Sequence, residues 1–203
     1  MSEQPPVNNT LETMPSGLEG QMLIAMPSIG DDRFDRAVIY ICAHSPDGAM
    51  GLIVNKEAEE LNFTDLLDQL NLLESSSSGT VHTPQLPVHL GGPVDTSRGF
   101  VLHSPDFFSD ASTLQISETV AMTASLDVMR AIAQRGEPQK ALFALGYAGW
   151  SPGQLEAEMA HNGWLHCEAD DNLLYGPSPN KYTDALAKIG IDLTALSGDV
   201  GHA

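Results

Sequence analysis

The sequence contains few basic residues. Nine Lys and Arg stand against 27 Asp and Glu among 203 residues, which gives a formal net charge of −18 at pH 7. Nucleic-acid binding depends on clustered Lys and Arg that neutralise phosphates, whereas the cations here are scattered along the chain. We therefore expect no direct nucleic-acid partner. A net charge this far from zero is typical of proteins that charge repulsion keeps soluble.

Long apolar runs are absent, and cysteine is scarce. No stretch is long and apolar enough to span a bilayer, and the N-terminal residues lack the basic region and apolar core of a signal peptide. The two cysteines, Cys42 and Cys167, lie far apart without a CxxC spacing. This favours free thiols in a reducing compartment, with a single disulfide as the alternative. We expect a cytoplasmic protein with no membrane association.

The hydrophobic share of 42% is enough for one core of ordinary size. Residues 1–17 are polar and contain three prolines, so we expect a mobile N-terminal arm there. A single domain should follow over 18–192, with a tail over 193–203. Strand patterns precede helix patterns without regular alternation, which favours an α+β fold over a doubly wound parallel sheet.

Apolar runs bounded by glycine, proline and polar residues predict the strands. Residues 36–44 are apolar on both faces, which predicts a central strand whose alternation places Cys42 and His44 on one face. Helical periodicity predicts, among others, a helix with Asn62 or Thr64 as its N-cap and one that buries Leu126. Strands are expected over 18–26, 36–44, 51–55, 87–90, 99–103, 114–117, 120–123, 140–147, 165–168 and 172–175, and helices over 62–73, 126–134, 152–161 and 179–189.

The stretch over residues 141–165, ALFALGYAGWSPGQLEAEMAHNGWL, carries the clearest local signals. Its apolar strand is expected to end in a tight turn over GYAGW, residues 146–150. Ser151 and Gln154, with a proline between them, match a capping box, so the next helix should have Ser151 as its N-cap. Asn-Gly at 162–163 should end that helix in the left-handed conformation.

Seven sequence blocks in a fixed order form a specific pattern. The blocks are GQMLIAMP at 20–27, RAVIYICAH at 36–44, GAMGLIVNK at 48–56, GGPV at 91–94, RGFVLH at 98–103, GYAGWSPGQLEAE at 146–158 and NGWL at 162–165. Together they resemble the AlgH/YqgE family of bacterial proteins over roughly residues 18–192. Tyr182 stands where this pattern leads us to expect tryptophan in the last helix, which affects only local packing.

The resemblance implies a single-domain, cytoplasmic α+β protein with a mixed sheet. We expect this sheet to be largely antiparallel, either open or barrel-like, and packed with about four short helices. The family is linked to regulation of exopolysaccharide (alginate) synthesis in some bacteria. It brings no established reaction, cofactor or catalytic set with it, so the resemblance implies far more about fold than about function.

Unusual polar residues stand beside the glycine-rich turns. Glycine admits a close approach of the backbone to a ligand, and the N-terminus of a helix offers free amides to an anion. If the loops converge, Arg98 would supply the positive charge. The predicted ligand- or partner-binding residues are His44, Asn55, Gly91, Gly92, Arg98, His103, Trp150 and Gln154.

A purely structural interpretation of these residues stays open. Turn geometry and capping account for the glycines and Gln154, and Arg98 would then pair with a nearby carboxylate. No pattern is a GxGxxG or a P-loop, so nucleotide binding has weak support. His44, His89 and His103 lack HxH or HExxH spacing, so we expect no metal site, and we predict no cofactor and no catalytic residues.

We therefore predict a non-enzymatic cytoplasmic protein that binds an unidentified protein or small ligand through its loops, because loops on a rigid scaffold carry function more often than strands do. The alternative is a small-molecule enzyme, a hydrolase, that uses Arg98 with His44 or His103 in the glycine-rich cleft. Substrate, partner and oligomeric state have no signal in the sequence.

Overall fold

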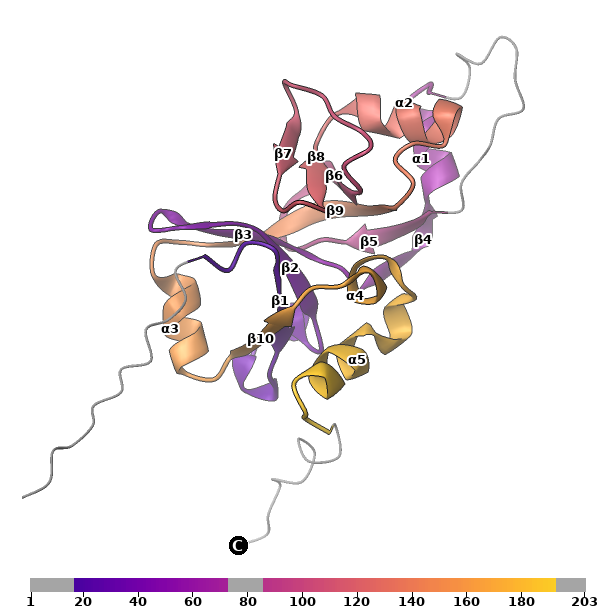
Figure 1. Cartoon of the computed structure of the whole chain (residues 1–203). Helices are drawn as coiled ribbons and strands as arrows, with labels where there is room; N and C mark the ends of the chain where they lie inside the picture. The colour runs from indigo at the N-terminus through magenta and orange to yellow at the C-terminus, as the bar shows by residue number, and fades with distance from the viewer. Residues whose placement is uncertain (1–16, 73–85, 193–203) are drawn as a thin grey trace, which may run out of the picture.

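The computed structural model describes residues 17–72 and 86–192. The arm predicted over 1–17, apart from Gly17, and the tail predicted over 193–203 lie outside the described residues. Within them the chain forms one α+β domain whose core is a curled, mixed sheet (Figure 1). The α+β class and the largely antiparallel sheet predicted from the sequence are confirmed.

Ten strands form the sheet, and all their pairings are antiparallel except that of β5 with β9. The order is β10-β1-β2-β3-β9-β6-β8-β7, while β5 pairs with β9 and β4 pairs with β5. The strands are Gln21–Ala25 (β1), Val38–Ser45 (β2), Gly48–Ile53 (β3), Glu57–Asn62 (β4), Pro87–Leu90 (β5), Val94–His103 (β6), Thr113–Gln115 (β7), Ala121–Thr123 (β8), Ala141–Trp150 (β9) and Trp164–Glu168 (β10).

Five α-helices lie within the described residues, one more than predicted. None of them is long and apolar enough to cross a bilayer. They are Phe63–Gln69 (α1), Leu126–Arg135 (α2), Gln154–Ala160 (α3), Asp171–Tyr175 (α4) and Lys181–Lys188 (α5), and short 3-10 turns occupy Pro27–Ile29, Asp32–Phe34 and Ser178–Asn180.

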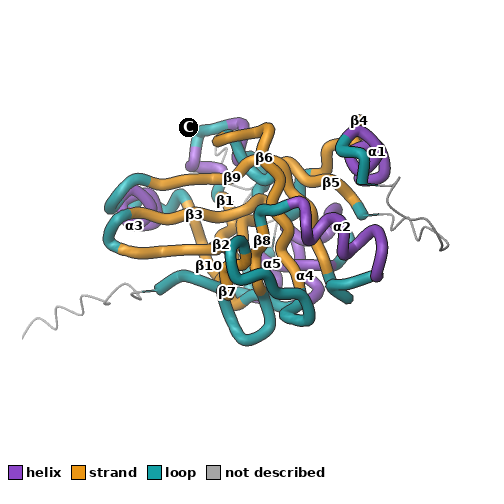
Figure 2. Tube along the Cα trace, turned by 90° about the horizontal axis from the view of Figure 1, so that it is seen from above, coloured by secondary structure: helices purple, strands orange, loops and turns teal. Residues whose placement is uncertain are grey.

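The helices lie against three different parts of the sheet (Figure 1). Each part carries its own hydrophobic cluster. The largest cluster includes Tyr40, Leu102 and Leu186 and lies under α4 and α5. A second, with Ile39 and Leu155, lies under α3. The third lies under α1 and α2, both of which contribute buried side chains to it. Seen from above, α3 with the β2–β3 hairpin and the α1–α2 pair lie at opposite ends of the molecule (Figure 2).

The strand β9 corrects the prediction for residues 141–165. It continues through GYAGW to Trp150 instead of ending in a turn, because Ala148 to Trp150 pair with β3. The helix α3 then begins at Gln154, and Ser151 makes no side-chain cap. The predicted end is confirmed, with one difference: Asn162, not Gly163, takes the left-handed conformation, with φ +56°.

The strand predicted over 172–175 is wrong. Residues 171–175 form α4, which follows β10, and the Asp170 side chain caps it by accepting a hydrogen bond from the amide of Leu173 at 2.9 Å. An aspartate in this position stabilises the free amides of a first helical turn. Tyr182, in the helix α5 that follows, is buried and donates its hydroxyl to the carbonyl of Ala25.

A bulge in β2 overturns the prediction that Cys42 and His44 lie on one face of the strand. The register with β3 shifts between Ile41 and Ala43, and a bulge of one residue moves the side chains beyond it to the other face. Cys42 therefore packs into the largest cluster, whereas His44 contacts Glu156 of α3 on the opposite face. Both cysteines are free thiols, and burial raises the pKa of Cys42.

Glycines in GGPV bring two backbone segments into close contact. A Cβ atom on Gly91 would lie 2.3 Å from the carbonyl oxygen of Gly146, and one on Gly92 would lie 2.1 Å from the carbonyl carbon of Tyr147. Gly92 also has φ +153°, which side chains rarely tolerate. The space that these glycines leave is thus taken by β9, a central strand of the sheet.

The change Gly92→Ala is expected to be severely destabilising, because the new Cβ meets backbone that cannot move aside. Gly136→Ala is the matched control, since Gly136 has φ +67° but a Cβ atom there would meet nothing within 4 Å. We expect about 1 kcal/mol for the control and at least ~3 kcal/mol for Gly92→Ala in urea unfolding. Equal losses in the two variants would show that conformation alone, and not the close contact with β9, requires glycine at position 92.

Candidate functional site

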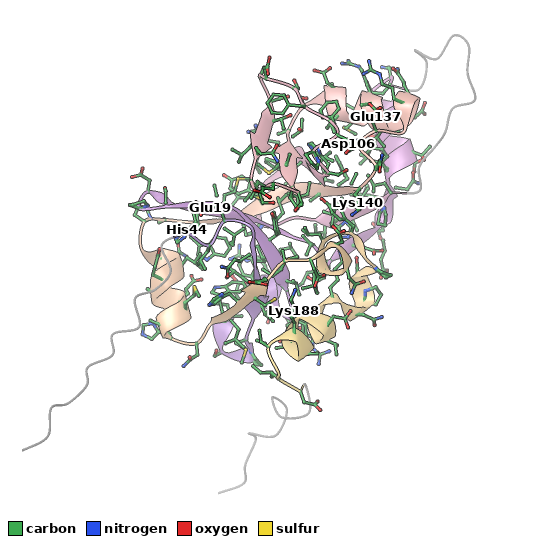
Figure 3. The ribbon with its side chains drawn as sticks, viewed as in Figure 1. Glu19, His44, Asp106, Glu137, Lys140 and Lys188 are labelled. Atoms are coloured by element: carbon green, nitrogen blue, oxygen red, sulfur yellow. The ribbon has the colours of Figure 1, made fainter. Side chains whose placement is uncertain are left out.

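His44 is tied to its surroundings through both ring nitrogens. Nδ1 accepts a hydrogen bond from the amide of Leu18 at 3.2 Å, so Nε2 carries the proton and donates to Oε1 of Glu156 at 2.7 Å. The amide of Glu156 and then the His44 ring hold the pKa of that carboxyl below its usual value. Figure 3 shows His44 beside Glu19, which accepts from the His44 amide. His44 therefore holds α3 and residues 18–19 against β2.

Trp150 and Gln154 meet at a single carboxylate. Oε2 of Glu158 accepts hydrogen bonds from the indole N–H of Trp150 at 2.9 Å and from that of Trp164 at 2.7 Å. Oε1 of Glu158 accepts from the side-chain nitrogen Nε2 of Gln154 at 2.8 Å. The oxygen of the Gln154 side chain accepts from the Ser151 amide at 3.0 Å, which is half of the predicted capping box. The geometry attaches α3 to β9 and β10.

Asn55, Gly91 and Gly92 lie where β3 and β5 approach β9. The Asn55 side chain accepts from the amide of Val38 and donates to the carbonyl of Arg36, both at 2.8 Å. The carbonyl of Gly91 accepts from the Ile53 amide, and its own amide donates to Leu145. All three residues thus have structural roles, and their predicted role in binding stays a prediction.

His103 is fully buried and points into the protein. Its Nδ1 donates to the carbonyl of Ser104, and Nε2 accepts from the hydroxyl of Thr123, both at 2.8 Å. The Thr123 hydroxyl in turn accepts from Thr113 at 2.7 Å. Burial lowers the pKa of His103, so the ring is neutral and this direction of hydrogen bonds is maintained.

Arg98, predicted to lie beside the GGPV turn and just before a strand over 99–103, lies within β6, because this strand already begins at Val94. Its guanidinium carbon lies 5.3 Å from the centre of the Phe100 ring, a cation–π distance. The predicted pairing of Arg98 with a carboxylate is wrong for the described residues, in which no ion pair includes it. In contrast, four other cations have carboxylate partners: Arg33, Arg130, Lys140 and Lys188.

Two hollows share Arg98. The first, which we call the β7 hollow, has a volume of about 670 Å³. The second, the α1–α2 hollow, has a volume of about 400 Å³. The β7 hollow is lined by Met50, Phe100, Asp110, Thr113, Met122 and Tyr147, among others. The α1–α2 hollow is lined by Leu66, Leu70, Leu126, Met129, Phe143 and Leu145, among others.

The structure does not bring the predicted site residues to one hollow. Of the eight, only Arg98 lines the β7 and α1–α2 hollows. Trp150 and Gln154 lie together at Glu158, and His44 contacts the same helix through Glu156. The residues that meet at Glu158 and Glu156 and those that line the hollows at Arg98 are thus different sets. The α1–α2 pair also lies at the opposite end of the molecule from α3 (Figure 2).

Sequence reasoning missed the aromatic and methionine side chains around Arg98. Phe100 lies two residues after Arg98 on β6, so strand alternation places both on one face. That signal is present in the sequence. Tyr147, whose ring packs edge-on against Phe100 with centroids 5.8 Å apart, comes from a strand that the sequence does not pair with β6 by any local pattern. Leu126, predicted to be buried, is 41% exposed beside the α1–α2 hollow.

The comparisons with known proteins give the chain's family. The family model described as AlgH-like matches residues 22–194. The chain belongs to the AlgH-like family. This AlgH-like chain is 53% identical to a UPF0301 protein of Nitrobacter hamburgensis, with 93% of the chain and 88% of that protein aligned. It is 52% identical to one of Afipia carboxidovorans, with 92% and 90% aligned.

Two solved structures resemble the AlgH-like chain. The solution structure of the AlgH protein from Pseudomonas aeruginosa is 41% identical, has a TM-score of 0.72, and aligns over 95% of this chain and 99% of its own. A crystal structure of a Corynebacterium diphtheriae protein is 20% identical with a TM-score of 0.66, aligning over 91% and 93%. The second likeness shows the fold alone.

Removing the Glu158 carboxylate should destabilise the protein, since two buried indole N–H groups lose their acceptor. We expect Glu158→Ala to cost about 3 kcal/mol in urea unfolding followed by tryptophan fluorescence. Glu156→Ala, two residues earlier on the same helix, is the control. Its carboxylate is 40% exposed in its pair with His44, so its loss should cost at most about 1 kcal/mol. A Glu158→Ala loss no larger than the control's would contradict the role assigned to Glu158.

Proposed function

We propose that this chain is a non-enzymatic binding protein with a regulatory role, and that Arg98 with its two hollows binds an organic anion that has an apolar or aromatic body. The observation that carries this proposal is the exposed guanidinium of Arg98, which lacks an ion pair within the described residues of a chain with net charge −18. The other charges of so acidic a chain repel anions. An arginine that has no carboxylate partner and lies beside a hollow therefore attracts an anion to that one place.

The electrostatics favour an anionic head at Arg98. A guanidinium binds carboxylate or sulfonate oxygens through paired N–H donors, and its stacking on Phe100 holds the plane in place. Asp110 lines the β7 hollow as well. Its negative charge repels the head from that wall, so the ligand should place its charge against Arg98 and turn its body away from Asp110.

The walls of the hollows favour an apolar body. The α1–α2 hollow is lined largely by aliphatic side chains, of which Leu70 is 42% exposed and Leu126 is 41% exposed. Methionines line both hollows, Met50 and Met122 in one and Met129 in the other. Methionine adapts to bodies of different shape, and covering exposed leucine stabilises the complex by the hydrophobic effect.

The hydrolase alternative has less support. It requires His44 or His103 beside Arg98 as a proton acceptor, but both rings use both nitrogens in contacts away from the two hollows. Neither histidine therefore lies where this alternative needs its proton acceptor. The link to exopolysaccharide regulation and the cytoplasmic location, which the family resemblance implies, belong to this proposal too.

The experiment uses 1-anilinonaphthalene-8-sulfonate, an aromatic anion whose fluorescence rises in apolar surroundings. We expect saturable binding of one molecule per chain. Arg98→Gln should weaken it at least ~10-fold, because one charge-assisted hydrogen-bonded contact is lost. Arg135→Gln is the control, since Arg135 is also an exposed cation, in the last turn of α2.

Comparing the dye affinity of the two variants tests the proposal. Binding that Arg98→Gln weakens and Arg135→Gln leaves unchanged supports a site at Arg98. Binding that falls equally in both variants would instead report net charge, and binding that neither variant alters would place the dye elsewhere. Either of those results would contradict the proposal.

A further inference from the structure

A third hollow, with a volume of about 330 Å³, lies between β5 and the start of α5. We call it the α5 hollow. It is lined by Glu57, His89, Leu142, Tyr175, Ser178 and Lys181, among others. Three of these side chains are polar and buried: His89 is 4% exposed, Ser178 is 6% exposed and Lys181 is 1% exposed. The residues that line the α5 hollow differ from those around Arg98, so it is a separate site.

The hydrogen bonds of His89 fix which nitrogen carries its proton. Nδ1 lies 3.2 Å from the carbonyl oxygen of Phe143, which can only accept, so the proton is on Nδ1. Nε2 of the neutral ring is then an acceptor, and it lies 3.0 Å from the hydroxyl oxygen of Ser178. The hydroxyl of Ser178 therefore donates to His89. A serine bonded to a histidine that a third group orients is the general arrangement of an activated nucleophile.

The third polar group is a cation. Nζ of Lys181 donates to the carbonyls of Val54 at 2.8 Å and Leu174 at 2.7 Å. An ammonium group has three N–H donors, so one is left for a further acceptor. Ser178 begins the 3-10 turn Ser178–Asn180, and Lys181 follows three residues later. Residues three apart in a 3-10 turn lie on one face, which places hydroxyl and ammonium on the same side of the hollow.

We propose that Ser178 is an acyl-accepting nucleophile and that the α5 hollow takes small activated esters, with His89 as the base and Lys181 as the donor to the oxyanion. This reaction is a single acylation per chain, without turnover, at a site separate from the anion binding proposed at Arg98, so the chain remains a non-enzymatic binding protein. The apolar wall of Leu142 and Tyr175 suits a short, uncharged acyl or aryl group.

The acylation step balances without a further reactant. Oγ of Ser178 attacks the acyl carbon while its proton passes to Nε2 of His89, and the carbonyl oxygen becomes an oxyanion that accepts from Nζ of Lys181. The bond from the acyl carbon to the leaving oxygen then breaks, and the leaving oxygen takes the proton from Nε2. The products are acyl-Ser178 and the free alcohol.

The charges around His89 limit the substrate class. Burial, and then the Lys181 ammonium, lower the pKa of His89 to about 4, so the ring is a weak base. A weak base suits esters whose leaving group needs little protonation, such as aryl esters. Burial also lowers the pKa of Lys181 to about 8, an effect that Glu57 partly offsets. The cation that stabilises the oxyanion is thus present at neutral pH and lost as the pH rises through about 8.

The test treats the full chain with p-nitrophenyl acetate and maps acetylated residues by mass spectrometry. We expect one p-nitrophenol released per chain in a burst, with the acetyl group on Ser178. Ser178→Ala should abolish this burst, and His89→Gln should slow acetylation of Ser178 at least ~100-fold. Ser151→Ala, the loss of an exposed serine, is the matched control and should react like the parent.

The pH profile separates this chemistry from nonspecific acetylation. Acetylation of Ser178 should be level between about pH 6 and about pH 7.5 and fall above about pH 8, as Lys181 loses its proton. Exposed lysines gain reactivity over the same interval, because their amines deprotonate. No acetyl group on Ser178 in the folded parent protein would overturn the proposal. Two other results would overturn it: a rate of Ser178 acetylation that rises with pH, or one that His89→Gln leaves unchanged. The pH profile of the parent protein tests the proposal even if a variant does not fold.

Discussion

The close backbone contact between GGPV and β9 is the constraint on which the rest of the structure depends. Gly91 and Gly92 approach Gly146 and Tyr147 at distances that leave no room for a side chain. On one side of this contact β9 pairs with β5 and β6, and on the other it pairs with β3. The contact therefore joins the two halves of the sheet, and the hydrophobic cluster under α4 and α5 takes side chains from both of them.

Arg98 lies close to this contact on β6. The pairing of β6 with β9 shifts register between Val94 and Gly99, next to the glycine contact. Arg98 lies inside this irregular stretch, directly before the paired residue Gly99. Its guanidinium lies over the Phe100 ring, against which Tyr147 of β9 packs edge-on, and it lines both the β7 and the α1–α2 hollows. We regard the cation as part of the rigid sheet rather than of a loop.

Sequence reasoning succeeds where local signals decide the structure. Apolar alternation, Asn62 as the N-cap of α1 and the end of α3 at Asn162 are all set by neighbours within a few residues. It fails where segments distant in the sequence determine the local structure. The strand β4 is acidic and largely exposed, with no apolar alternation, and forms only because β5 lies beside it. In the same way, pairing with β3 extends β9 through GYAGW, whose glycines alone indicate a turn.

The candidate sites show the same division. Arg98 is predictable because it is a cation beside the glycine-rich GGPV turn, but its neighbours come from β3, β7, β8 and β9, which no local pattern groups. The dyad of His89 and Ser178 joins residues 89 positions apart, so spacing carries no signal of it. The bulge at Cys42, a matter of one residue in the register with β3, decides that His44 faces α3.

The most direct test of the claim that Arg98 and its two hollows, and not the loops around α3 and GGPV, present the binding surface is an amide chemical-shift titration of the protein with 1-anilinonaphthalene-8-sulfonate. The account predicts shifts at residues 97–100, 110–114, 122–126 and 147, which line or adjoin the hollows around Arg98. Shifts centred instead on His44, Gln154 and residues 91–92, with those around Arg98 unchanged, would contradict it.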